Sequence, residues 1–241
     1  MLAATPKTFV LVHGASHGGW CWRTVAERLR GHGYCVTTPT LTGLGERAHL
    51  LDGVIDLDTH ITDITNHIRF EELDDIVLVG HSYAGAVITG VANRMAGRIG
   101  RLIYLDAVLL KDGETVMSQA PKAVAEQRMQ FAKEAGGLVM PVPPASAFGV
   151  TDPEQSAWLE SKLTPHPINT YLTELRLDGT TGTDLPAAYI ECTDPLYRGL
   201  DQSHKRARQT GWPLHQLATG HDAMMVAPRE TADLLEAIAE S

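Results

Sequence analysis

The serine at position 82 lies in the sequence GHSYAG, residues 80–85, directly after the apolar run Asp75–Val79. This pattern predicts a buried strand that ends in a sharp turn and continues as a helix, with Ser82 at the tip of the turn. Small neighbours let the helix fold back close to the strand, although Ala84 stands where a strict G-x-S-x-G pattern has glycine. Ser82 is therefore a candidate nucleophile, and a buried serine that caps a helix is the structural alternative.

A serine hydroxyl needs a base to take its proton and an acid to orient that base. Asp194 follows the strand-like run Ala187–Cys192, and His221 follows the run Leu214–Ala218. The carboxyl ends of parallel strands meet at one edge of a sheet, so these side chains can approach Ser82. We therefore predict Ser82, Asp194 and His221 as a catalytic triad.

Other residues compete for the two partner roles. Asp106 also ends a strand-like run and is a rival acid, but it can equally be a hinge or capping residue. His204 and His215 are rival bases. The first lies in a polar, helical stretch, and the second lies within a strand, where a structural histidine is common.

An acyl-transfer site also needs backbone N–H groups that face the developing oxyanion. The glycine-rich loop 13–20, HGASHGGW, and the residue after the nucleophile supply such groups, which predicts the amides of Ala15 and Tyr83 as the oxyanion hole. A helix-entry turn is the alternative interpretation of this loop. His13 and His17 have no third ligand at a suitable spacing, so no metal is expected, and no cofactor either.

Strand-like runs alternate with helical patterns over most of the chain, which predicts a mostly parallel sheet flanked by helices. The remaining expected strands are 8–13, 34–38 and 101–105, and helices are expected near 22–30 and from Pro228 onward. Between positions 107 and 185 the alternation stops and prolines gather. We expect residues 1–106 and 186–241 to form the core, and residues 107–185 to be a helical cap inserted after a late sheet strand.

Helical stretches near 123–135 and 153–163 lie in the expected cap. Phe131, Trp158 and Tyr171 make this segment too apolar for a solvated tether. These three side chains are candidates to line a substrate pocket, although packing of the cap onto the core explains each of them equally well.

The chain has 241 residues, 44% hydrophobic and 20% charged, which suits one large globular domain. A net charge of −9 without a basic run speaks against nucleic acid and anionic membranes as partners. Three cysteines without a metal-binding spacing favour a reducing compartment. With no signal-like start or long apolar run, we expect a cytoplasmic protein that acts on a small molecule.

Taken together, the loop 9–22, the elbow at Ser82, the turn at Asp194 and the turn at His221 resemble the α/β-hydrolase superfamily. Within it they are similar to the group of plant methylesterases, hydroxynitrile lyases and bacterial esterase relatives. The resemblance implies the α/β-hydrolase fold, the triad and oxyanion hole named above, and a buried apolar pocket under the cap. It also suggests a homodimer, by analogy with relatives.

Two positions separate members of this group. Hydroxynitrile lyases of this type carry a threonine where this chain has Gly14 and a lysine where it has Asp222. A positive charge favours departing cyanide and an aspartate opposes it, so hydrolysis is favoured. We expect a serine carboxylesterase for small to medium, apolar or aromatic esters. A lyase or carbon–carbon cleaving enzyme with the same triad, or a small-molecule receptor with slow turnover, remains the alternative.

Overall fold

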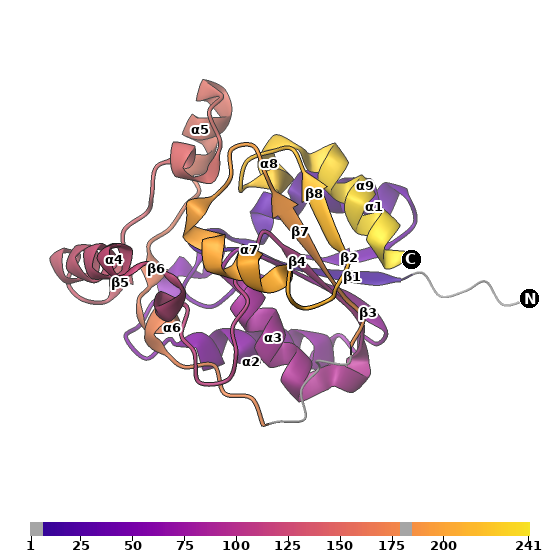
Figure 1. Ribbon diagram of the computed structural model, residues 1–241, viewed down its shortest axis with the longest axis horizontal. Helices are drawn as coiled ribbons and strands as arrows, with labels where there is room; N and C mark the ends of the chain where they lie inside the picture. The colour runs from indigo at the N-terminus through magenta and orange to yellow at the C-terminus, as the bar shows by residue number, and fades with distance from the viewer. Residues whose placement is uncertain (1–6, 179–184) are drawn as a thin grey trace, which may run out of the picture.

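The computed structural model describes residues 7–178 and 185–241, and it contains a six-stranded parallel sheet (Figure 1). The strand order is β2-β1-β3-β4-β7-β8, and each neighbouring pair is parallel. The strands are β1 Thr8–Val12, β2 Cys35–Thr37, β3 Ile76–His81, β4 Ile99–Leu105, β7 Ala187–Cys192 and β8 Leu214–Leu217. All six predicted strands and the predicted fold class are confirmed.

Helices cover both faces of the sheet, as Figure 1 shows. On one face α1 (Arg23–Gly31) packs beside α9 (Pro228–Ala239), and on the other α2 (Leu57–Phe70) packs beside α3 (Ala84–Met95). Two short helices, α7 (Asp201–Ala207) and α8 (Ala223–Val226), follow β7 and β8. The predicted helices near residues 22–30 and from Pro228 onward are confirmed.

The central strands show why this layered packing forms. In β3, Val77 and Val79 join the apolar cluster under α1 and α9, whereas Ile76 and Leu78 join the cluster under α2 and α3. Side chains alternate between faces along a strand, so a strand that is apolar at every position must be covered on both sides. This burial holds the carboxyl ends of the strands, where the candidate residues lie, in fixed positions.

The inserted segment leaves the sheet after β4 and returns at β7. Its elements are α4 Lys122–Glu134, β5 Val139–Met140, α5 Pro153–Glu160, β6 His166–Pro167 and α6 Asn169–Leu172. In Figure 1, α4 and α5 stand away from the helices that flank the sheet. The helices expected near 123–135 and 153–163 are present, and a two-residue antiparallel pair, β5 with β6, was not expected. Two of the predictions concern segments outside the described residues. These are residues 179–184, which belong to the expected cap, and residues 1–6, where no signal segment is expected.

Short 3-10 turns complete the described elements. They are η1 Gly19–Trp22, η2 Gly45–Leu50, η3 Ala96–Arg98, η4 Met117–Gln119, η5 Ala145–Phe148 and η7 Arg198–Leu200. Among the described residues, no helix is long and apolar enough to cross a membrane.

The turn at Ser82 has the sharp geometry that its sequence predicts. Ser82 has a φ of 54°, in the left-handed region that a residue with a side chain rarely adopts. Its carbonyl oxygen accepts hydrogen bonds from the amides of Gly85 (3.1 Å) and Val108 (2.9 Å). Gly85 lies so close to the chain beyond β4 that a Cβ on it would overlap the carbonyl oxygen of Val108. The glycine is therefore required by close backbone approach.

Replacement of Gly85 by alanine is expected to destabilise the fold. The added methyl group meets backbone rather than a movable side chain, so we expect a loss of about 1–3 kcal/mol in the free energy of unfolding. Gly97→Ala is the matched control, because nothing lies within 4 Å of the added Cβ there. Urea denaturation of both variants measures the difference, and equal midpoints would contradict the close approach at Gly85.

Candidate active site

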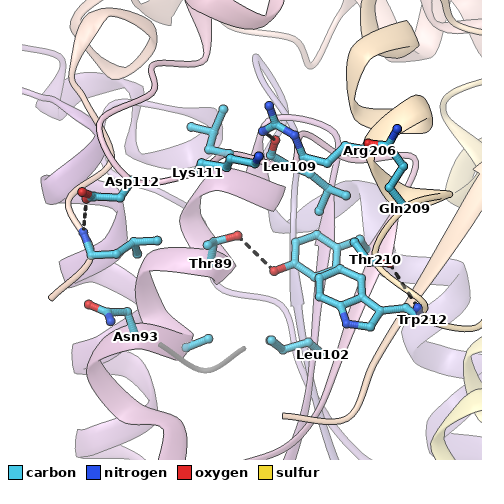
Figure 2. A pocket seen from close by; sticks show the side chains of 14 residues that line it. Thr89, Asn93, Leu102, Leu109, Lys111, Asp112, Arg206, Gln209, Thr210 and Trp212 are labelled. Atoms are coloured by element: carbon cyan, nitrogen blue, oxygen red, sulfur yellow. Dashed lines mark hydrogen bonds between the residues drawn. The ribbon is translucent and has the colours of Figure 1, made fainter. Parts of the chain in front are cut away.

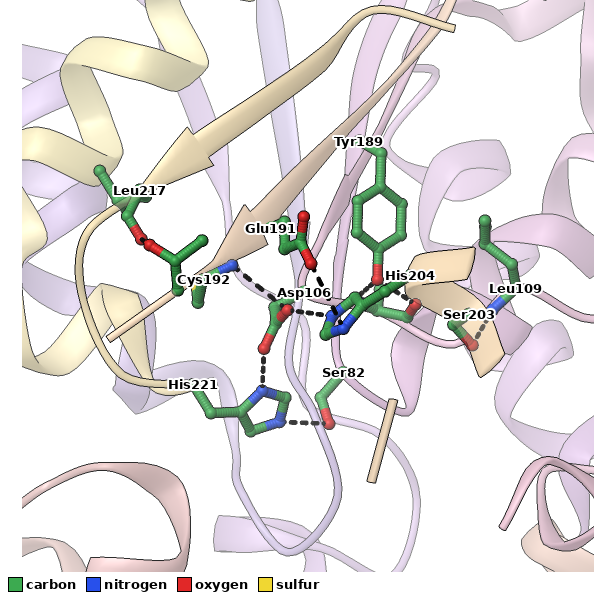
Figure 3. Close-up of polar contacts among 12 residues, drawn as sticks. Ser82, Asp106, Leu109, Tyr189, Glu191, Cys192, Ser203, His204, Leu217 and His221 are labelled. Carbon is green, nitrogen blue, oxygen red and sulfur yellow. Dashed lines mark hydrogen bonds and ion pairs between the residues drawn. The ribbon is translucent and has the colours of Figure 1, made fainter. Parts of the chain in front are cut away.

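Ser82 and His221 are in direct contact at the carboxyl edge of the sheet. The Ser82 hydroxyl donates to Nε2 of His221 across 2.8 Å, and Figure 3 shows the imidazole between Ser82 and a carboxylate. β3 ends at the turn that carries the serine, and the loop after β8 carries the histidine. The ring of Tyr197 stacks on the imidazole with 4.1 Å between centroids. The structure therefore brings together the predicted nucleophile and the predicted base.

Asp106, the first residue after β4, is the carboxylate on the other side of His221. Its Oδ2 accepts from Nδ1 of His221 at 2.6 Å, and its Oδ1 accepts from Nε2 of His204 at 2.7 Å. Burial alone would raise the pKa of this carboxyl, but the hydrogen bonds from His204 and His221 outweigh it and lower the pKa to about 2. Asp106 is therefore an ionised, fully buried carboxylate at neutral pH.

The expectation that Asp194 contacts His221 is wrong. The Asp194 side chain is exposed, and its backbone amide donates to the carbonyl oxygen of Thr219 across 3.0 Å. The reason is the tight turn after β7, in which Thr193 pairs with Leu196 and directs the intervening residues toward solvent. Asp106 has a φ of 41° directly after β4, and its buried side chain lies beside the imidazole of His221.

The sequence contains a signal that favours Asp106 as a buried acid. The aspartate stands inside an apolar run, with Leu105 before it and Ala107 to Leu110 after it. A charged residue in such a run becomes buried, and a buried carboxylate requires donors or a counter-charge. Asp194 stands between Thr193 and Pro195, which is the composition of a turn.

The two rival bases differ in position. His204 lies buried on α7 and contacts Asp106, but it does not contact Ser82. His215 lies within β8, opposite Ile190 of β7, and among the described residues it has no hydrogen bond to Ser82 or Asp106. Neither rival therefore replaces His221 as the partner of Ser82.

The predicted oxyanion donors lie near the serine. Within residues 7–178 and 185–241, the amides of Ala15 and Tyr83 donate to no protein acceptor, and Ala15 lines the cavity that contains Ser82. The Ala15 carbonyl accepts from Nδ1 of His17 at 2.7 Å, which fixes the loop. His13 fixes it from the other side, because its Nε2 accepts from the amide of Leu41 at 3.1 Å.

Gly14 lacks space for a side chain. A Cβ there would lie 2.8 Å from Nδ1 of His81 and 2.9 Å from Cβ of Ser82. The threonine that distinguishes hydroxynitrile lyases therefore does not fit without a shift of the nucleophile turn. This observation adds a steric reason to the expectation of hydrolysis.

Asp222 forms a buried ion pair rather than a free negative charge. Its Oδ2 accepts from Nε2 of His17 at 2.9 Å. Burial opposes the charge on His17, but Asp222 outweighs it and raises the pKa of the imidazole. The charge of Asp222 is thus largely compensated and opposes the departure of cyanide less than a free carboxylate would. The lack of space for a threonine at Gly14 is therefore the stronger reason to expect hydrolysis.

Within the described part of the chain, one group has the spacing of metal ligands: His81, His221 and Asp222, with ligand atoms within 4.8 Å of one another. Each of the three already has protein partners. His81 bonds to the carbonyl oxygen of His221 at 3.0 Å, and burial lowers the pKa of His81 to about 3, so it stays neutral. We interpret this group as support for the position of His221.

A cavity of about 450 Å³ opens onto Ser82. Its walls include Arg128, Phe131 and Tyr171 from the inserted segment and Tyr197 from the core. Phe131 and Tyr171 thus lie where the sequence suggested, whereas Trp158 does not line the cavity and packs against Trp20 with 5.4 Å between ring centroids. The size and the apolar walls suit a small or medium ligand.

A second cavity of about 520 Å³ lies elsewhere, between α3 and α7 (Figure 2). Leu102, Leu109 and Trp212 are among its lining residues, and the Trp212 ring stacks on Tyr104. Ser82 and His221 do not line it. The chemistry of the site therefore belongs to the smaller cavity.

The class of this protein follows from the sheet, the serine turn and the comparison with known families. Residues 9–234 match the model of the alpha/beta hydrolase family, so the chain belongs to that family. It is 41% identical over 245 residues to the carbendazim hydrolyzing esterase of Nocardioides sp. (strain SG-4G), covering 95% of this chain and 98% of the relative. On this similarity, the chain is a carboxylic ester hydrolase.

Two further proteins show weaker sequence similarity to the chain. Pheophorbidase of Raphanus sativus is 34% identical over 114 residues, which cover 44% of this chain and 41% of that protein. Among solved structures, an extracellular α/β-hydrolase from a Paenibacillus species superposes with a TM-score of 0.88 at 24% identity, covering 98% of this chain and all of the other (100%). This last similarity is evidence for the fold alone.

The buried Asp106 carboxylate makes stability depend on pH. Its pKa in the folded protein, about 2, lies below the ordinary value of 3.8, so its contribution is present above about pH 4 and is lost as the pH falls through 2. We expect the difference in free energy of unfolding between wild type and Asp106→Asn to shrink by roughly 2 kcal/mol as the pH falls from about 5 to 2. Denaturation at several pH values measures it. Asp194→Asn is the control, because its side chain is exposed, and its free energy of unfolding should change with pH as that of wild type does. A difference between wild type and Asp106→Asn that stays constant with pH would contradict the conclusion that Asp106 is an ionised, buried carboxylate.

Proposed function

We propose that the chain hydrolyses small to medium carboxylic esters, apolar or aromatic in character, through an acyl-enzyme on Ser82. The Ser82 oxygen attacks the ester carbonyl carbon while Nε2 of His221 takes its proton. The same nitrogen then protonates the departing alcohol, which leaves an acyl group on the serine. Water, deprotonated by His221, attacks the acyl carbon, and the acid departs as Ser82 regains its proton.

The observation that carries this proposal is the pair of short contacts at His221. The 2.8 Å contact to Ser82 allows proton transfer, and the 2.6 Å contact to Asp106 favours the tautomer with its free lone pair toward the serine. The ionised carboxylate also stabilises the imidazolium that forms during attack. In this proposal Asp106 takes the role that the sequence analysis assigned to Asp194.

The oxyanion hole is proposed at the amides of Ala15 and Tyr83. Both belong to segments that turn close to Ser82, and neither amide has a protein acceptor among the described residues. Donors that are fixed before the reaction stabilise the negative charge on the carbonyl oxygen without rearranging.

Residues 107–185 are proposed to act as a cap over this site, with residues 1–106 and 186–241 as the core. Most of the cavity wall comes from the inserted segment, including Phe131, Met140 and Phe148. Arg128 lies over the ring of Tyr171 at 5.7 Å and adds a cationic group to a mostly apolar wall. This composition supports an apolar or aromatic ester, and the name of the Nocardioides relative adds carbendazim to the panel of trial substrates.

A cytoplasmic location and a homodimer are also proposed, on narrower grounds. Cys21, Cys35 and Cys192 are all free thiols, which suits a reducing compartment. The homodimer rests on the resemblance to relatives.

Ser82→Ala should abolish ester turnover. We expect a loss of kcat of about 10³-fold or more on p-nitrophenyl acetate or butyrate, because the group that forms the acyl-enzyme is gone. A fluorophosphonate probe provides the second readout and should label wild type at Ser82 but leave the variant unlabelled. Equal turnover by the two proteins would refute the mechanism.

Asp106→Asn and Asp194→Asn distinguish the two candidate acids. An asparagine at position 106 removes the charge that stabilises the His221 imidazolium, and losses of about 10³–10⁴-fold in kcat are typical of such changes in serine protease triads. Asp194→Asn should stay within about twofold of wild type, because its side chain is exposed. Steady-state kinetics on the same esters decide the matter, and the opposite pattern would restore Asp194 as the acid.

A further inference from the structure

A second imidazole contacts the buried carboxylate from the side opposite His221. His204 lies on α7, is 2% exposed, and donates from Nε2 to Oδ1 of Asp106 at 2.7 Å. Figure 3 shows the carboxylate between the two rings, one on each oxygen. His204 takes no part in the proton transfers proposed for ester hydrolysis.

His204 is the principal donor to its side of the carboxylate. Within the described chain, the other donor to Oδ1 is the amide of Cys192, at 3.3 Å. A hydrogen bond of 2.7 Å between an imidazole and a carboxylate is much stronger than an amide contact at 3.3 Å. The orientation of Asp106 therefore depends on the two histidines.

The far side of His204 meets a second buried carboxylate. Its Nδ1 lies 3.6 Å from Oε1 of Glu191, a β7 residue that is 2% exposed. Glu191 in turn pairs at 2.5 Å with Arg208, which follows α7 and reaches solvent. The edge of the Tyr189 ring, also on β7, completes the surroundings of His204. Acidic groups thus face both nitrogens of this imidazole.

We propose that His204 is a positioning residue for ester hydrolysis, which holds Oδ2 of Asp106 against His221 by binding Oδ1. This inference rests on the proposed roles of Ser82, His221 and Asp106. Without His204, the 3.3 Å contact from the Cys192 amide is the remaining bond to Oδ1 among the described residues. The carboxylate can then rotate about its Cβ–Cγ bond, and the tautomer and orientation of His221 are less strictly fixed. His204 does not line the cavity at Ser82, so substrate binding is not its role.

The pH dependence gives a readout specific to this role. A hydrogen bond from His204 draws charge from Asp106, and its loss leaves a carboxylate that holds the proton on His221 more strongly. His221 must be unprotonated to accept the serine proton. The acid limb of the kcat/KM profile should therefore move to higher pH when the donor is removed.

The experiment compares His204→Phe with His204→Gln on p-nitrophenyl esters. Phenylalanine fills the volume but has no donor. We expect it to lower kcat by about 10- to 100-fold, by analogy with the losses that follow removal of a residue that orients a metal-binding histidine. KM should change by less than about threefold, and the acid limb should rise by about 0.5 pH unit. Glutamine presents an amide N–H near the place of Nε2, so it should recover most of the lost kcat and keep the acid limb close to that of wild type.

Ser203→Ala is the matched control on the same helix. Its hydroxyl accepts from the amide of Leu109 at 3.1 Å, so the variant perturbs the packing of α7 without touching Asp106. We expect a lower Tm with an unchanged acid limb. A folded His204→Phe protein with wild-type kcat and acid limb would overturn the proposal, and so would an equal shift in Ser203→Ala.

Wild-type protein provides a test that does not depend on a variant that folds. Nitrogen NMR of ¹⁵N-histidine-labelled protein should show a proton on Nε2 of His204 at neutral pH, and an unprotonated Nε2 would overturn the proposal. The Ser82→Ala result separates this failure from that of the proposed function. If Ser82→Ala is inactive while His204→Phe is unaffected, only the positioning role is lost.

Discussion

The Asp106 carboxylate is the group on which the rest of the site depends. It is a charge removed from water, and it is tolerated there because two imidazoles donate to it, from His204 and His221. Those donors come from segments that follow β7 and β8, while the carboxylate follows β4. The two hydrogen bonds to Asp106 therefore fix the ends of β4, β7 and β8 relative to one another. They also hold His221 within hydrogen-bond distance of Ser82, which follows β3.

Much of this architecture could be predicted from the sequence. All-apolar runs rich in β-branched side chains, such as residues 76–79, are typical of strands covered on both faces, and the small residues around Ser82 indicate a helix packed closely against its strand. These signals are local, because they depend on residues adjacent in the chain. The fold and the nucleophile were predicted for that reason, whereas His221 was predicted from its place after a strand that ends at the same edge of the sheet.

Position at the end of a strand does not decide between the two candidate acids. Asp106 and Asp194 both follow strands that end at the same edge, and their order along the chain does not determine which one reaches His221. The decision depends on the direction of each turn, inward with a left-handed residue at Asp106 and outward through the tight turn after β7. The pocket wall was equally hard to foresee, because Phe131 and Trp158 have the same character in the sequence and only one of them faces the cavity.

Two sets of hydrogen bonds hold the inserted segment where it leaves the sheet after β4. The amide of Val108 donates to the carbonyl of Ser82 at 2.9 Å, and the Tyr189 hydroxyl contacts both the amide and the carbonyl of Ala107 at 2.9 and 2.8 Å. These bonds hold the first residues of the insertion against the serine turn and against β7. The insertion is tied to the histidine loop as well, because the carbonyl of Phe148 accepts from the amide of Asp222 at 3.0 Å. Substitutions that reshape the pocket wall are therefore mechanically coupled to the residue beside His221.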